Sequence, residues 1–72
     1  MPETHIKNKL NAYKSELNIQ NIYTIHTFIK NINILHNDIK QAGYKELLIE
    51  MNIFQKIVEQ KTHELLQFHN IR

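Results

Sequence analysis

Residues 44–69 read YKELLIEMNIFQKIVEQKTHELLQFH, a stretch without glycine or proline. Apolar side chains recur in it every three or four positions, which is the spacing of one face of an α-helix. This first apolar stripe consists of Tyr44, Leu47, Met51, Phe54, Val58, Leu65 and Phe68. The stretch is therefore predicted to be one long helix with a buried face, and the rest of the chain must supply the cover for that face.

A second apolar stripe lies nearly opposite the first. It consists of Ile49, Ile53 and Ile57, which follow one another at intervals of four residues. One antiparallel neighbour covers one stripe, and each helix of a three-helix bundle buries one wedge rather than two opposite sides. We therefore predict that a partner covers the second stripe. Cover by the first helix of the same chain is the alternative.

Two shorter helices are predicted upstream. Residues 4–17 are expected to form the first, after a start at Pro2 and Thr4. Residues 20–41 are expected to form the second. In residues 4–17 the side chains that recur at helical spacing are Ile6, Leu10, Tyr13 and Leu17. In residues 20–41 they are Ile22, Ile25, Ile29, Ile32, His36 and Ile39. The two patterns are out of phase, which favours a break between them with Asn18 or Asn21 as the cap of a new helix. One kinked helix is the alternative.

Gly43 is the only glycine and lies between two helical patterns, where a left-handed residue ends a helix. A loop this short joins antiparallel neighbours. The chain is thus predicted to be all-α, a single domain over residues 1–72 with helices at about 4–17, 20–41 and 44–69. Its architecture would be an antiparallel helical hairpin with an additional short N-terminal helix. The expected seam of the hairpin joins Ile22, Ile25, Ile29, Ile32 and Ile39 to Met51, Phe54, Val58, Leu65 and Phe68.

Composition excludes several classes of function. The chain has no cysteine, so neither a disulfide nor a thiolate–metal site is available, and a reducing cytoplasm is compatible with this. The longest apolar run is Leu47 to Ile49, which is too short to span a membrane, and the start shows no signal-peptide pattern. The formal net charge is only +2 and the lysines are dispersed, so binding to nucleic acid is not expected.

No enzymatic, cofactor or metal site is predicted. Ser15 is the only serine and has no glycine-rich motif around it. Glu59 and His63 are one helical turn apart, which is typical of a surface pair rather than of a metal site. His36 is expected to be partly buried in its apolar stripe. Tyr23 lies far round from that stripe, so it is predicted to be exposed and to bind the partner together with Ile49, Ile53 and Ile57.

The order of these features resembles a known family. A turn at residues 38–43 precedes Tyr44, and the long apolar helix ends in Phe68-His69-Asn70. This pattern, with the small size, the lack of cysteine and the richness in isoleucine, asparagine and lysine, resembles the small co-chaperones of type III secretion needle subunits. The resemblance covers the chain from Leu35 onward, and Tyr44 and the Phe68-His69-Asn70 ending are its individual matches.

The resemblance implies a cytoplasmic helical hairpin that binds a tetratricopeptide-like chaperone. Together the two proteins would keep the needle subunit soluble and unpolymerised. Two alternatives stay open. One is a self-associating hairpin that forms a four-helix dimer through the stripe of Ile49, Ile53 and Ile57. The other is a small regulator that binds nucleic acid through Lys7, Lys9 and Lys14.

Overall fold

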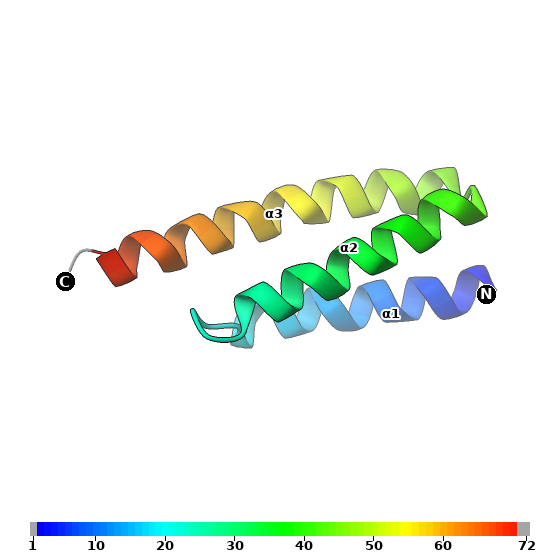
Figure 1. The fold of residues 1–72 in the computed structure, drawn as a ribbon. Helices are drawn as coiled ribbons and strands as arrows, with labels where there is room; N and C mark the ends of the chain where they lie inside the picture. The colour runs from blue at the N-terminus through cyan, green and yellow to red at the C-terminus, as the bar shows by residue number, and fades with distance from the viewer. Residues whose placement is uncertain (1, 71–72) are drawn as a thin grey trace.

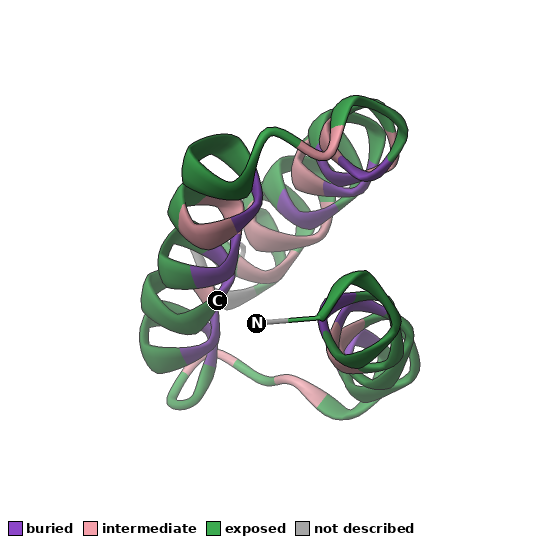
Figure 2. Ribbon diagram, turned by 90° about the vertical axis from the view of Figure 1, so that its right-hand side faces the viewer, coloured by how far each residue is buried: buried purple, intermediate pink, exposed green. Residues whose placement is uncertain are grey.

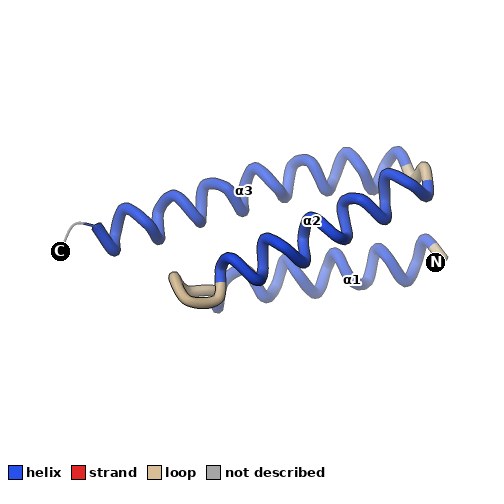
Figure 3. The backbone as a smooth tube through the Cα atoms, viewed as in Figure 1, coloured by secondary structure: helices blue, strands red, loops and turns tan. Residues whose placement is uncertain are grey.

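The computed structural model describes residues 2–70, and the side chains of residues 2–68. Helix α1 spans Glu3–Glu16, α2 spans Ile25–Ala42 and α3 spans Lys45–Asn70, and a short 3₁₀ turn, η1, covers Leu17–Ile19. No strand occurs in the described part (Figure 3). The prediction of an all-α hairpin with a short N-terminal helix is confirmed.

Successive helices run in opposite directions, so α1 and α3 share one direction and α2 opposes both (Figure 1). Seen from one end, the three helices occupy the corners of a triangle and turn their buried residues inward (Figure 2). The molecule is elongated, with extents of 45 × 16 × 16 Å. The C-terminal end of α3 extends beyond the turn that joins α1 to α2 (Figure 1). The last turns of α3 therefore have fewer neighbours than the rest of the helix.

One apolar core joins all three helices. On α1, Ile6 and Leu10 are 1% and 0% exposed, which makes the N-terminal helix an integral part of the core rather than an appendage. Burying one such aliphatic side chain stabilises the fold by about 1.5–3 kcal/mol. The buried residues are Ile6, Leu10, Leu17, Ile25, Phe28, Ile32, Leu35, Ile39, Leu47, Met51, Phe54 and Val58.

Gly43 ends α2 as predicted. Its φ is +78°, in the left-handed region that favours glycine. Its N–H donates to the carbonyl oxygens of Ile39 and Lys40 at 3.1 and 3.3 Å, so the last turn of α2 is closed by backbone hydrogen bonds. Helix α3 begins two residues later, at Lys45. This short connection places α2 and α3 side by side as a hairpin.

The predicted break between the first two helices is also present, and Asn21 organises it. The Asn21 side-chain oxygen accepts the N–H groups of Tyr23 and Thr24 at 2.8 and 3.1 Å. In return, Thr24 Oγ1 accepts the Asn21 N–H at 3.0 Å. This reciprocal arrangement holds residues 21–24 in a turn, so α2 begins at Ile25 rather than near residue 20. The N-cap of α2 is Thr24, without a side-chain cap hydrogen bond, so Asn21 caps the turn that precedes the helix rather than α2 itself.

Three details of the sequence prediction were wrong. Phe68, expected in the hairpin seam, is 78% exposed because α3 extends beyond the start of α2. Ile22 belongs to the turn and is only half-buried. At the start of α1 the N-cap is Pro2, without a side-chain cap hydrogen bond, so Thr4 does not cap the helix. The side chains of His69 and Asn70, which contribute to the family resemblance, lie outside the described residues.

Candidate partner-binding surface

Ile49, Ile53 and Ile57 form a line of exposed aliphatic side chains on α3, here named the isoleucine stripe. Their side chains are 61%, 58% and 51% exposed. Spacing of four residues places them along one ridge of the helix surface. Helix α1 packs beside this ridge without covering it. The intramolecular alternative, complete cover by the first helix, is therefore not what the fold provides.

An open groove of about 520 Å³ lies beside the stripe, between α1 and α3. We name it the α1–α3 groove. Leu17 is nearly buried and forms part of its floor with Phe54, while Ile53 and Ile57 extend the apolar surface outward. Its lining residues are Lys14, Leu17, Asn18, Glu50, Ile53, Phe54 and Ile57. The stripe and the groove together make one continuous apolar surface with a polar edge.

Lys14 and Glu50 link the two walls of this groove. Lys14 Nζ lies 3.4 Å from Glu50 Oε1, and the two side chains are 39% and 41% exposed. An ion pair this exposed contributes little to stability, because solvent and salt screen it. Its effect on the surface is electrostatic: the Glu50 carboxylate is compensated by a lysine of the opposite wall.

Tyr23 does not belong to this surface. Its side chain is 87% exposed, as predicted, but it stands in the turn before α2. It lines a separate groove of about 300 Å³ together with Glu16, Gln20, Thr24, Thr27, Phe28 and Asn31. The two grooves share no lining residue. The structure therefore brings the three isoleucines together but places Tyr23 at another site.

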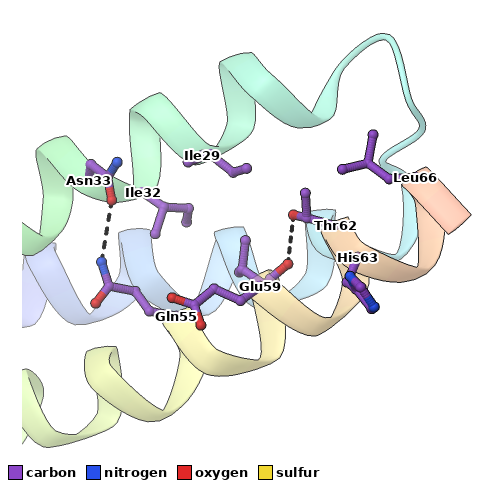
Figure 4. A pocket seen from close by; sticks show the side chains of 9 residues that line it. Ile29, Ile32, Asn33, Gln55, Glu59, Thr62, His63 and Leu66 are labelled. Carbon is purple, nitrogen blue, oxygen red and sulfur yellow. Dashed lines mark hydrogen bonds between the residues drawn. The ribbon is translucent and has the colours of Figure 1, made fainter.

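A third groove, of about 450 Å³, lies between α2 and α3, and the sequence analysis did not identify it (Figure 4). Polar side chains interrupt the seam of the hairpin here: Gln55 Nε2 donates to Asn33 Oδ1 at 3.4 Å, and Thr62 Oγ1 donates to the Val58 carbonyl at 2.8 Å. In the sequence, this groove is indicated by the polar residues Gln55 and Thr62, which occupy positions on the side of α3 that faces α2. The groove is lined by Ile29, Ile32, Asn33, Gln55, Val58, Glu59, Thr62, His63 and Leu66.

Glu59 and His63 lie together at the edge of this α2–α3 groove, and both are exposed. No group of three potential metal-ligating side chains occurs among the described residues. His36 is half-buried on α2, as predicted from its place in the apolar stripe. Within the described residues, none of the helices is both long enough and apolar enough to cross a membrane.

Comparisons with known protein families, with curated proteins and with solved structures gave no match for this chain.

Proposed function

We propose that the protein is a non-enzymatic protein-binding module whose partner covers the isoleucine stripe. The observation that supports this is the exposure of Ile49, Ile53 and Ile57, each more than half exposed on consecutive turns of one helix. Single exposed aliphatic residues are ordinary on protein surfaces, whereas contiguous apolar surfaces mark interaction sites. The adjoining α1–α3 groove enlarges the surface that a partner can bury.

The family resemblance extends this proposal to a specific role. As a co-chaperone of type III secretion, the protein would act in the cytoplasm. It would bind a tetratricopeptide-like chaperone, and the complex would keep the needle subunit soluble. The helical hairpin formed by α2 and α3, the small size of the chain and the apolar surface on α3 all accord with such a role.

The test compares Ile53→Glu with Ile34→Glu. Ile34 is a matched control because it is 53% exposed, close to the 58% of Ile53, but lies on α2. Circular dichroism should show that both variants remain helical. Co-purification with the candidate chaperone and needle subunit should fail for Ile53→Glu alone, because burying an unpaired carboxylate against an apolar partner is costly.

Each contrary result identifies a different error. Unfolding of Ile53→Glu alone would mean that the stripe belongs to the core and that partners bind elsewhere. Unchanged binding by a folded Ile53→Glu variant would remove the stripe from the interface. An Ile53-dependent partner that is neither a tetratricopeptide-like chaperone nor a needle subunit would contradict the co-chaperone role and leave the protein-binding role in place.

A further inference from the structure

The connection between α1 and α2, residues 17–24, lacks the residues that fix a turn permanently. We name it the hinge. It contains neither glycine nor proline, and Gly43 alone has a positive φ among the described residues. Leu17 and Thr24, at its two ends, already lie in the right-handed helical region, whereas Gln20 is extended, with φ −74° and ψ 146°. Every residue type in the hinge is therefore compatible with one helix that continues from α1 into α2.

Side chains on the surface hold the hinge in its bent shape. Asn21 and Thr24 exchange the hydrogen bonds of the turn, and Gln20 Nε2 donates to the Glu16 carbonyl at 2.9 Å. All of these bonds are exposed to solvent, where a hydrogen bond contributes little net stability because water competes for both partners. A helix through the hinge would replace them with backbone hydrogen bonds.

Helix α3 is long enough to pair with a straightened hinge. The contact of Asn33 with Gln55 sets the antiparallel register of α2 and α3. In that register residues 64–68 continue past the start of α2 and are level with residues 20–24 (Figure 1). One helix over residues 17–42 would match the 26 residues of α3.

Straightening the hinge would also cover apolar side chains that the single chain leaves accessible. Ile22 is half-buried and Leu66 is 40% exposed. Ile22 comes two helical turns before Ile29 in the sequence, and Ile29 lines the α2–α3 groove together with Leu66. In a continuous helix Ile22 therefore lies on the same side as Ile29 and level with Leu66, and it extends the apolar seam between α2 and α3.

We propose that the hinge straightens and that two copies of the chain exchange their α1 helices. When α1 continues from α2, it points away from its own hairpin, so the apolar face that receives Ile6 and Leu10 is left open. The α1 of a second copy fits this face without any change, because the two chains are identical. The exchange is reciprocal and gives a closed dimer.

The contact of Tyr13 with Phe28 places the twofold axis of this dimer at the hinge. Helix α1 runs antiparallel to α2, and the midpoint between these two residues in the sequence lies within the hinge. Two straightened chains that keep the contact therefore cross there. Phe68 is level with Gln20, and on α3 it lies on the same side as Ile57, which lines the α1–α3 groove. The two Phe68 side chains, 78% exposed in the single chain, are thereby brought close to the axis.

The exchanged dimer keeps the surfaces of the single chain. The Lys14–Glu50 contact and the α1–α3 groove are rebuilt from two chains. The isoleucine stripe of each copy stays exposed, so one assembly presents two stripes, and a partner with two binding segments is held more strongly than by one. The exchange goes beyond the proposed function and does not depend on it.

The decisive experiment links α1 of one chain to α3 of another. The chain has no cysteine, so Lys14→Cys and Glu50→Cys each carry a single thiol. The two full-length variants are mixed, unfolded and refolded together across a concentration series, and a short bismaleimide then links neighbouring thiols. We expect covalent dimers of about 17.4 kDa, twice the 8.7 kDa of one chain, that contain one copy of each variant. Lys14→Cys mixed with Lys30→Cys is the control and should give none, because Lys30 is exposed on α2.

Three results would overturn the exchange. The first is a chain that remains monomeric throughout the series in size-exclusion chromatography with light scattering. The second is a dimer whose thiols are not linked in the mixture of Lys14→Cys and Glu50→Cys. The third is loss of the dimer in Ile53→Glu, which would assign self-association to the isoleucine stripe. We expect Ile53→Glu to leave the dimer intact, since Ile53 is 58% exposed.

Two substitutions of Ile22 test the straightened hinge. Both remove most of the same side chain, but only Ile22→Pro interrupts a helix that passes through this position. Proline suits the bent hinge, because the Asn21 carbonyl accepts the N–H groups of Thr24 and Ile25 at 3.2 and 3.0 Å and so makes Ile22 the first residue of that turn. Compared with Ile22→Ala, Ile22→Pro should raise the dissociation constant of the dimer at least about tenfold. Equal constants would show that the hinge does not straighten and would overturn the inference.

Phe68→Ala tests the position of the axis. It should raise the dissociation constant of the dimer about fivefold, because each dimer loses two buried rings. Gln67→Ala changes the exposed neighbouring residue and should have no such effect. Equal constants for these two variants would place the axis away from the hinge and contradict the exchange.

Discussion

The rings of Tyr13 on α1 and Phe28 on α2 pack edge to face, with centroids 5.8 Å apart and planes at 87°. Aromatic pairs in this geometry contribute about 0.5–1.5 kcal/mol beyond the area they bury. The contact lies at the end of α1 that is next to the turn, close to Leu17. Together with the burial of Ile6, Leu10 and Leu17, this contact joins α1 to the hairpin.

Phe54→Ala should destabilise the protein by about 3–5 kcal/mol, since Phe54 is 3% exposed in the shared core. A domain of this size has a total stability of similar magnitude, so the variant should be largely unfolded when alone. Phe68→Ala is the control, because Phe68 is 78% exposed and should change the free energy of unfolding by less than about 0.5 kcal/mol. Urea denaturation followed by circular dichroism measures both. Equal losses would contradict the assignment of the core.

Asn21→Ala should cost about 0.5–2 kcal/mol, the usual range for loss of a capping side chain. Its side-chain oxygen accepts two backbone N–H groups in the turn that leads into α2. Asn18→Ala removes the same amide from an exposed residue that lies before the turn, so it should be nearly neutral. Urea denaturation of the two variants side by side distinguishes them, and a neutral Asn21→Ala would show that the turn holds without this side chain.

Gly43→Ala should destabilise the hairpin by about 1 kcal/mol because a side chain disfavours the left-handed conformation. Steric crowding is not the cause, since no atom lies within 4 Å of the position that a Cβ would occupy. Gly43→Asn should be less harmful, because asparagine tolerates this conformation better. Thermal denaturation of the two variants should rank them in that order. The opposite order would indicate that conformation does not govern this position.

Amides of α1 should exchange with solvent faster than those of residues 29–39 on α2. The reason is that α1 contributes only Ile6 and Leu10 to the buried core, while α2 contributes five buried residues along its length. Local opening of α1 therefore exposes less apolar surface than global unfolding does. Hydrogen exchange followed by NMR measures this at each residue. Equal protection of Leu10 and Ile32 would show that α1 opens only when the whole domain unfolds.

The helices were predictable from the sequence because their signals are local. Apolar spacing of three and four residues identified all three, and Gly43 marked the hairpin because only its backbone adopts φ +78° at low cost. The break near Asn21 was also visible, but the start of α2 was not. It depends on a reciprocal hydrogen-bonded turn between Asn21 and Thr24, and residue spacing does not reveal such a turn.

The exposed isoleucine stripe was predicted from spacing alone, whereas its surroundings were not. Whether α1 covers Ile53 depends on how α1 packs against the hairpin, and contacts such as that between Tyr13 and Phe28 join residues far apart in the sequence. Tyr23 is separated from the stripe because it lies in the turn before α2, and Phe68 is exposed because α3 extends beyond the start of α2. Periodicity along a chain determines the faces of each helix, but which face is covered depends on the space between helices.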